Sequence, residues 1–271
     1  MVGRLRVSKS RKKEGLVLVE GVRAVTEALD AGVGGRFAVT SERLGQTSGG
    51  SALAARLAST DLELNPIDDA ALRALASTEH PQGVLLVCSE PRASLDLVEA
   101  GMRLLVLDGV QDPGNSGTLV RAAVAFGLDA VIVLEGTADP WGAKTVRASA
   151  GMAFRIPVIQ ARSGDTVAAL RHAGVPLLVA AAVGAPVGAP VGAAPVGAAP
   201  VGELGRKSVG GDVSEGDFAL AVGNEGAGVR DELRDAATST VSIPMPGPAE
   251  SLNVAMAGSV LLYELAKESG A

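Results

Sequence analysis

Short apolar runs alternate along the chain with segments whose apolar residues recur at helical spacing. The runs are bounded by glycine, proline or polar clusters, which is typical of buried β-strands. The intervening segments have the three-to-four residue period of amphipathic helices. This alternation predicts an α/β fold, with a parallel sheet covered by helices on both faces. A polar segment, SEPRASLDLVEAG, is expected to link two domains.

The first predicted domain covers residues 1–92 and has a small α/β pattern. Its expected strands are Leu16–Gly21, Arg36–Thr40, LELNPID and GVLLVC. Helices are expected between them, and the last of these opens at Asp68 and Asp69. Two carboxylates at that point fit the cap and first turn of a helix better than an acid–base pair.

The second predicted domain covers residues 103–271 and carries most of the apolar runs. Its expected strands are RLLVLD, AVIVL, IPVI, PLLVAA, FALAV and TVSI, with helices at Gly117–Phe126 and Ser251–Ala266. Residues 183–202 repeat VGAP and VGAAP without a polar side chain. A proline every four or five residues suits neither a helix nor a central strand, so we expect a low-complexity insertion that loops out. The same prolines argue against a membrane-spanning helix.

Three glycine-rich polar loops follow apolar runs of the second domain. They lie in LDGVQDPGNSGTLVRAAVAFG, AVGNEGAGV and IPMPGPAESLNVAMAGSVLLYEL. Parallel strands place such loops at one carboxyl edge, where open α/β sheets bind ligands. Their polar side chains are Asn115, Arg121, Asn224, Glu225, Ser251 and Asn253. There is no Cys/His cluster and no Lys-containing phosphate loop, so we expect no metal and a ligand held largely by backbone amides. A nucleotide-binding turn is the alternative for the second loop, although its G-x-x-G-x-G spacing differs from the dinucleotide fingerprint.

These three segments, taken together, resemble the motifs of the SpoU-type (TrmH-like) ribose 2′-O-methyltransferases of the SPOUT superfamily. The matching stretches are Asp108–Arg121, Gly223–Gly228 and Ile243–Ala257. The first domain resembles the L30e-type RNA-binding domain that precedes the catalytic domain in many of these enzymes. That likeness rests on Leu16–Val25 and on Thr78–Gly83.

The resemblance implies a parallel-sheet catalytic domain with a C-terminal trefoil knot, a homodimer, and S-adenosyl-L-methionine as cofactor. It implies that the cofactor is bound by Gly223, Asn224, Gly226, Ile243, Met245 and Leu252. The implied catalytic residues are Arg121, Asn115, Glu225, Ser251 and Asn253. It also implies that the small, apolar C-terminal helix helps to form the dimer interface.

Arg121 lies in the predicted helix Gly117–Phe126. The neighbouring residues are apolar, and an arginine on an apolar helix needs a partner. A guanidinium is a poor base. We therefore expect Arg121 to grip RNA phosphate and lower the pKa of the ribose hydroxyl, with phosphate or water as proton acceptor. Asn115 is expected to orient the ribose, and Glu225 to contact either the target nucleotide or Arg121.

The charge distribution matters more than the net charge of −6. Six cations precede the first acidic residue, Glu14: Arg4, Arg6, Lys9, Arg11, Lys12 and Lys13. This basic arm suits phosphate contacts, and an ordinary solvated terminus is the alternative. Lys144 and Arg147 are likewise expected either to contact RNA phosphate or to be solvated at the surface. Only 2% of residues are aromatic, which argues against a base-stacking platform, so Trp141 is expected to pack.

The single cysteine, Cys88, lies in an apolar run and is expected to be a buried, inert thiol. With no signal-peptide pattern, it indicates a cytoplasmic protein. His80 and His172 are expected in structural or surface positions.

The function predicted from the sequence is methyl transfer to a ribose 2′-hydroxyl of RNA, with 23S ribosomal RNA favoured over tRNA. Three alternatives remain at this point. The chain could be a catalytically silent RNA-binding or ribosome-assembly factor of the same fold, a tRNA ribose methyltransferase, or a nucleotide-binding α/β protein unrelated to RNA.

Overall fold

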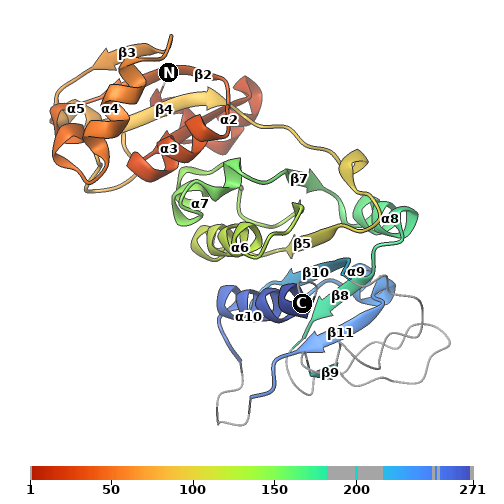
Figure 1. The fold of residues 1–271 in the computed structure, drawn as a ribbon. Helices are drawn as coiled ribbons and strands as arrows, with labels where there is room; N and C mark the ends of the chain where they lie inside the picture. Colours follow the sequence, from red (N-terminus) through yellow and green to blue (C-terminus); the bar gives the residue numbers. More distant parts are fainter. Residues whose placement is uncertain (1, 182–198, 201–215, 246–247, 249–250, 269–271) are drawn as a thin grey trace. The chain divides into compact units, whose positions relative to one another are not determined.

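The computed structural model describes residues 2–181, 199–200, 216–245, 248 and 251–268 (Figure 1). The chain forms two compact units. The first consists of Met1–Pro91 and Asp139–Arg155, and the second of Arg92–Ala138 and Ile156–Ala271. The segment 139–155 therefore packs with the N-terminal residues, although it lies between two strands of the second unit.

The first unit has a four-stranded mixed sheet in the order β1-β4-β2-β3. Strand β4 pairs antiparallel with β1 and β2, and β3 pairs parallel with β2. The strands are β1 Leu16–Glu20, β2 Gly35–Thr40, β3 Glu63–Pro66 and β4 Val84–Ser89. The helices are α1 Val2–Leu5, α2 Ser8–Glu14, α3 Val22–Asp30, η1 Glu42–Gln46, α4 Gly50–Ala58, α5 Asp69–Leu75, α7 Ala143–Ala148 and η3 Met152–Phe154.

Several predictions for this unit are confirmed. Asp68 caps α5, since its Oδ1 accepts a hydrogen bond from the Ala71 amide at 2.8 Å. Trp141 is buried and packs on Phe154, with ring centroids 5.4 Å apart. Cys88 is fully buried in β4, and burial raises the pKa of its thiol to about 12, so it is neutral and inert at neutral pH.

The N-terminal basic segment is not an extended arm. It folds into α1 and α2, and Arg11 is buried. The Arg11 guanidinium donates to the Leu5 carbonyl at 2.8 Å and pairs with Asp139 at 2.5 Å. Arg11 therefore has a structural role, and the prediction that it contacts phosphate is wrong. The other five cations of this segment are exposed: Arg4, Arg6, Lys9, Lys12 and Lys13.

The Arg11–Asp139 pair predicts acid sensitivity of the first unit. Burial alone would raise the pKa of Asp139, but hydrogen bonds from Ser8 and Arg11 and the charge of Arg11 together hold it below its ordinary value. A carboxyl with a lowered pKa stabilises the fold above the unfolded value, 3.8, and loses that contribution as the pH falls through the folded value. We expect Asp139→Asn to lower the free energy of unfolding by about 3–5 kcal/mol at pH 7, because Arg11 is left buried without its counter-charge. The difference from wild type should shrink below the folded pKa of Asp139. Urea unfolding of both proteins across acidic and neutral pH checks this, and a pH-independent difference would contradict it.

The second unit has a sheet in the order β7-β6-β5-β10-β8-β11-β9, in which every pairing is parallel. The strands are β5 Arg103–Asp108, β6 Ala130–Leu134, β7 Val158–Ala161, β8 Leu177–Ala180, β9 Ala199–Pro200, β10 Phe218–Gly223 and β11 Ser239–Ser242. The helices are η2 Leu95–Leu97, α6 Pro113–Ala125, α8 Ser163–Ala173, α9 Asp231–Ala236 and α10 Val254–Glu268. The predicted parallel α/β sheet is confirmed.

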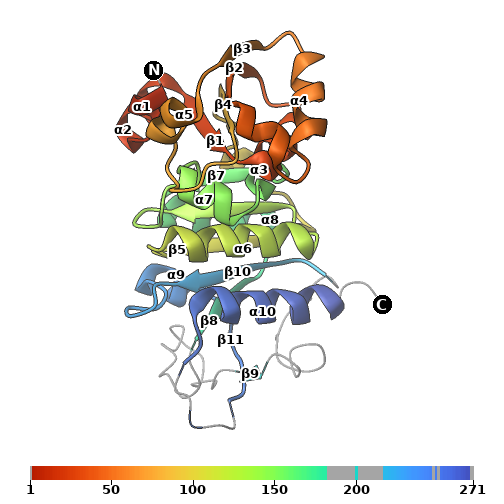
Figure 2. The ribbon, with the colours of Figure 1, turned by 90° about the vertical axis from the view of Figure 1, so that its left-hand side faces the viewer.

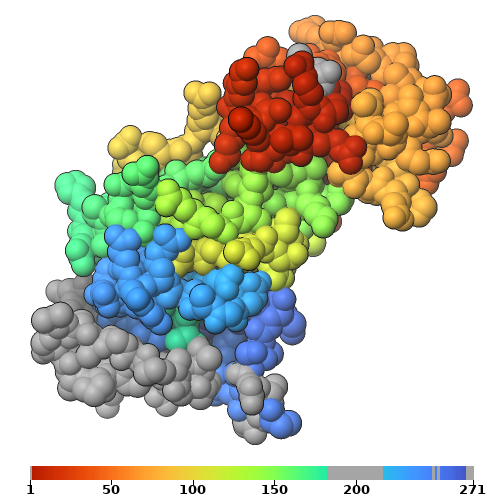
Figure 3. Space-filling view, turned by 180° about the vertical axis from the view of Figure 1, so that it is seen from behind, coloured from red at the N-terminus to blue at the C-terminus, as the bar shows by residue number. Residues whose placement is uncertain are grey.

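Helices cover both faces of this sheet. Helices α6 and α10 run side by side on one face (Figure 2), where Gly258 allows α10 to approach Leu119 of α6. Helices α8 and α9 contact each other on the opposite face, over a core that includes Val106, Ile132 and Ala221. In a space-filling view, blue C-terminal residues of the second unit lie against its yellow and green residues (Figure 3), and β10 pairs with β5, so distant parts of the sequence share one core.

Two predicted helix starts are wrong. Helix α6 begins at Pro113, a turn before the expected Gly117, because Asp112 caps it by accepting from the Asn115 amide at 2.9 Å. Helix α10 begins at Val254, after the expected Ser251, because Asn253 accepts from the Ala255 amide at 2.9 Å.

The predicted insertion, residues 183–202, lies outside the described residues except for Ala199–Pro200, which pairs with β11 at the sheet edge. Among the helices that the structure describes, none is long and apolar enough to cross a membrane.

Candidate active site

The three polar loops meet at the carboxyl edge of the second unit's sheet. Strands β5 and β10 end side by side, with Asp108 opposite Gly223, and β8 joins β10 to β11. A cavity of about 350 Å³ opens there. Its lining residues come from the ends of β8, β10 and β11, the loop after β10, helix α9, the segment before α10 and α10 itself: Val179, Ala180, Ala181, Val222, Gly223, Asn224, Glu225, Gly226, Ala227, Gly228, Val229, Arg234, Thr240, Ile243, Met245, Ser251, Leu252, Val254, Ala257 and Leu261.

This lining contains most of the residues selected from the sequence. All six predicted cofactor residues line the cavity: Gly223, Asn224, Gly226, Ile243, Met245 and Leu252. Of the predicted catalytic residues, Glu225 and Ser251 line it, whereas Asn115, Arg121 and Asn253 do not. The cavity also includes Arg234 and Thr240, which the sequence analysis missed. Arg234 pairs with Asp231 one helical turn earlier, a spacing visible in the sequence.

Three of the predicted catalytic side chains form one hydrogen-bonded row beside the cavity. Asn115 Nδ2 donates to Glu225 Oε1 at 2.7 Å, and Asn253 Nδ2 donates to Asn115 Oδ1 at 3.1 Å. The row links α6, the loop after β10 and the cap of α10. Both ends of the Asn115 amide are occupied, which fixes its orientation. Among the described residues Glu225 contacts Asn115 and not Arg121, and its contact with the target nucleotide stays a prediction.

The loop after β10 closes on itself. The backbones of Asn224 and Gly228 exchange two hydrogen bonds, at 3.0 and 2.9 Å. The Asn224 side chain accepts from the Gly226 and Ala227 amides and donates to the Gly109 carbonyl at 3.0 Å. Asn224 therefore holds both the loop and its contact with the end of β5.

Arg121 has a different setting from the one expected. It is exposed on α6 and forms no hydrogen bond or ion pair with any residue that the structure describes. Arg121 points to solvent rather than into the apolar interface, and the RNA phosphate partner expected from the sequence stays a prediction. The exposed Arg121 guanidinium can therefore bind an anion from outside the chain without breaking a hydrogen bond or ion pair with a described residue.

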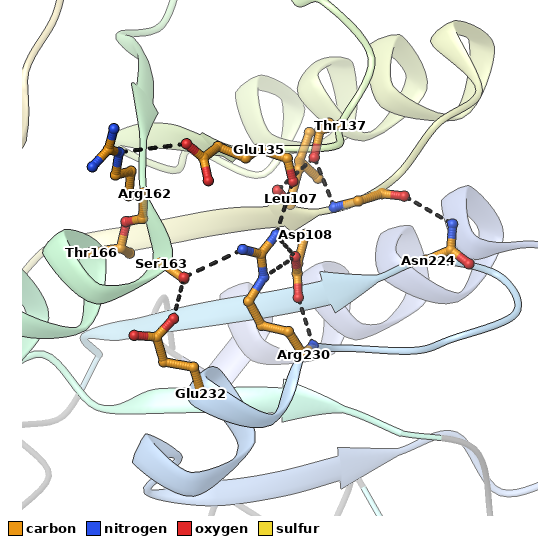
Figure 4. A network of polar contacts seen from close by, with 11 residues as sticks. Leu107, Asp108, Glu135, Thr137, Arg162, Ser163, Thr166, Asn224, Arg230 and Glu232 are labelled. Carbon is orange, nitrogen blue, oxygen red and sulfur yellow. Dashed lines mark hydrogen bonds and ion pairs between the residues drawn. The ribbon is translucent and has the colours of Figure 1, made fainter.

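An ion pair between a buried aspartate and a half-buried arginine adjoins the loop and was not predicted. Asp108 is 4% exposed, and its carboxylate accepts from the Arg230 backbone amide and from Arg230 Nε, each at 2.7 Å (Figure 4). The Arg230 guanidinium also donates to the Glu135 carbonyl at 2.9 Å and to Ser163 Oγ at 3.3 Å. The sequence placed Asp108 at a strand end, but nothing in the pattern linked it to Arg230.

The other predicted polar residues do not line this cavity. Arg147, in α7 of the first unit, pairs with the buried Glu20 at 3.6 Å and donates to Ser77 Oγ at 3.0 Å, so it is not simply solvated. Lys144, His80 and His172 are exposed. Among the described residues, no group of His, Cys, Asp or Glu is arranged to hold a metal ion.

Comparison with known families identifies both parts of the chain. The model of the SpoU rRNA Methylase family matches residues 102–263, and that of the MRM3-like substrate binding domain matches residues 2–86. The chain belongs to the SpoU rRNA methylase family. The matched range, residues 102–263, contains every residue that lines the cavity.

Relatives of this SpoU family chain match over nearly its whole length. The 23S rRNA (guanosine(2553)-2′-O)-methyltransferase RlmP of Bacillus subtilis is 34% identical, over 97% of this chain and 93% of its own. The 23S rRNA (uridine(2479)-2′-O)-methyltransferase of Streptomyces viridochromogenes is 30% identical, over 95% of this chain and 85% of its own. The AdoMet-bound rRNA methyltransferase of Sinorhizobium meliloti has a similar structure, with a TM-score of 0.79, 26% identity, and coverage of 98% and 92% of the two chains.

Proposed function

We propose that this chain transfers the methyl group of S-adenosyl-L-methionine to a ribose 2′-hydroxyl of 23S ribosomal RNA. The observation that carries the proposal is that two of the three motifs line one cavity, and that Asn115 of the third motif is hydrogen-bonded to Glu225 and Asn253 beside it. The names of full-length relatives, which are 23S rRNA 2′-O-methyltransferases, support the substrate class.

The cavity fits this cofactor in size and character. Its volume lies within the usual range for small-molecule sites, and Ile243, Leu252 and Leu261 give it apolar walls suited to an adenine ring. Glu225 places a carboxylate at its edge, which suits a cationic sulfonium. When bound, S-adenosyl-L-methionine supplies an already activated methyl group. The chain must then align the hydroxyl and favour loss of its proton.

We assign these tasks to the predicted catalytic residues. Asn115, held by Glu225 and Asn253, orients the ribose. Arg121 binds RNA phosphate and stabilises the negative charge that develops on the 2′-oxygen, while phosphate or water takes the proton. Ser251 lines the cavity just before α10 and contacts the bound ligands there.

We propose that the active unit is a homodimer formed through α10. Met256, Val260 and Tyr263 are 59%, 43% and 50% exposed and recur at i, i+4 and i+7, which places them on one helix face. This exposed apolar stripe lies on the same side of the sheet as α6, which carries Arg121. Because Arg121 does not line the cavity of its own chain, pairing of two copies would let one chain's arginine serve the other's cavity.

The dimer proposal predicts that Val260→Glu yields a monomer, because a carboxylate would be buried in the apolar interface without a partner. Val7→Glu is the matched control, since Val7 is 56% exposed but lies in the first unit. Light scattering after size-exclusion chromatography measures both masses. A Val260→Glu protein that stays dimeric would contradict the assigned interface.

We further propose that residues 1–92 form an L30e-type RNA-binding domain and that residues 103–271 carry the methyltransferase with a trefoil knot near its C-terminus. The charge distribution supports this division of labour. Residues 1–92 contain 12 Lys and Arg against 11 Asp and Glu, whereas residues 103–271 contain 12 against 17. The more cationic unit suits RNA phosphate. A cytoplasmic setting is proposed with it, because the single cysteine, Cys88, can form no internal disulfide, as is usual for proteins of a reducing compartment.

Labelled methyl transfer tests the proposed function directly. The protein is incubated with tritiated S-adenosyl-L-methionine and unmodified 23S rRNA, 16S rRNA or tRNA, and the labelled nucleoside is identified after digestion. We expect label on one ribose 2′-oxygen of 23S rRNA. Label only on tRNA would overturn the substrate assignment. Cofactor binding without transfer to any RNA or to ribosomal particles would favour a silent RNA-binding factor.

A further inference from the structure

The Asp108–Arg230 pair lies beside the cavity loop, yet neither residue lines the cavity. We propose that this pair is a positioning device for the loop Gly223–Val229, and that it sets the affinity for S-adenosyl-L-methionine without touching it. The inference rests on the proposed function, because that function assigns the cofactor to this cavity.

The location of the pair carries the argument. The loop enters from β10, whose last residue, Gly223, is paired in the sheet with Asp108. The loop leaves at Arg230, whose backbone amide and side chain both donate to that same aspartate. Asp108 therefore contacts both ends of the loop. It pairs with the first residue of the loop in the sheet, and its carboxylate binds the residue that follows the loop.

The Arg230 guanidinium extends the attachment beyond β5. It donates to the Glu135 carbonyl, which follows β6, and to Ser163 Oγ, at the start of α8 after β7 (Figure 4). Ser163 in turn donates to Glu232 in the first turn of α9. Three successive strand ends are thus tied to the residue that follows the loop. A guanidinium has several N–H donors in one plane and can make these contacts at once, whereas a lysine ammonium cannot. Lysine should therefore replace Arg230 poorly.

The loop itself needs external support. It contains three glycines in the six residues Gly223–Gly228, so its backbone has little intrinsic preference for one conformation. Asn224 fixes the front of the loop to the Gly109 carbonyl, and Thr137 Oγ1 in turn accepts from the Gly109 amide at 2.9 Å. Arg230, at the end of the loop, attaches it to the Asp108 carboxylate. A loop held in its binding conformation before the ligand arrives binds more tightly, because less ordering is required on binding.

Calorimetric titration of S-adenosyl-L-methionine into the full-length protein tests the inference, at a temperature well below thermal unfolding. We expect Asp108→Asn and Arg230→Gln to weaken binding about 10–100-fold, by analogy with the loss caused by removing the residues that orient metal ligands. Arg230→Lys should recover only part of the loss. Methyl transfer at saturating cofactor should fall much less than affinity, so that KM for the cofactor rises more than kcat falls.

Two controls separate positioning from general destabilisation. Leu170→Ala removes a buried side chain of α8 in the same unit and should lower Tm without changing the Kd for cofactor. Arg162→Ala removes an exposed arginine that pairs with Glu135 at 3.5 Å in the same neighbourhood and should change neither. Equal weakening by Leu170→Ala, or wild-type affinity in both pair variants, would overturn the positioning role. Failure of the wild-type protein to bind the cofactor would instead overturn the proposed function on which the inference rests.

Discussion

Replacing Arg121 with alanine is expected to lower the rate of methyl transfer to RNA about 10²–10³-fold, the loss typical of removing a group that stabilises developing charge. The loss should appear in kcat, because phosphate binding and charge stabilisation at the 2′-oxygen matter most in the transition state. Thermal stability should not change, because Arg121 is exposed and its side chain contacts no described partner whose loss would cost energy. Arg121→Lys should retain part of the activity, since it keeps the charge and loses the planar fork.

Arg171→Ala is the matched control for Arg121→Ala. Arg171 is also an exposed arginine of the second unit, but it lies on α8, across the sheet from α6. Single-turnover methylation of 23S rRNA, with cofactor affinity measured in parallel, distinguishes a catalytic effect from a damaged pocket. An Arg121→Ala protein that folds, binds cofactor and methylates at the wild-type rate would refute the assigned role.

The sequence predicted the sheet well because its strands are strongly apolar and bounded by clear breakers. β5, β6 and β10 are buried almost throughout, and each lies where an apolar run predicted it. The six predicted cofactor residues were found together in one cavity lining because loops on neighbouring parallel strands share one edge, and cofactor binding by them stays a prediction. The helix starts at Pro113 and Val254 were missed because several neighbouring polar residues could each cap a helix, and only the observed hydrogen bonds decide between them.

Long-range polar contacts could not be predicted from local patterns. The two ion pairs, Arg11 with Asp139 and Asp108 with Arg230, join residues that are far apart in the sequence. No hydrophobic or helical period predicts either pair. For the same reason the packing of residues 139–155 with the N-terminal unit has no local signal. A buried charge must find a partner, but the sequence does not say which one.

Gly223→Ala is expected to abolish measurable cofactor binding. A Cβ at this position would lie 2.2 Å from the Gly228 carbonyl carbon and 2.3 Å from the Val229 amide nitrogen. These are backbone atoms and cannot rotate away, so the loop would have to open and the cavity wall would move with it. The cost in stability should be moderate, about 1–3 kcal/mol, as for other overpacked sites, because β10 can remain paired with β5.

Comparison with a harmless glycine substitution makes the Gly223 prediction specific. Gly45→Ala is the control, since Gly45 is exposed and a Cβ there would meet no atom within 4 Å. Calorimetric titration with S-adenosyl-L-methionine and thermal unfolding should show wild-type behaviour for Gly45→Ala, and a folded protein without binding for Gly223→Ala. Because the clash is with the loop backbone, the result depends on the closed conformation that the Asn224–Gly228 hydrogen bonds maintain. Wild-type affinity in Gly223→Ala would mean that the closed loop is not the cofactor-binding conformation, and would remove the main structural support for placing the cofactor in this cavity.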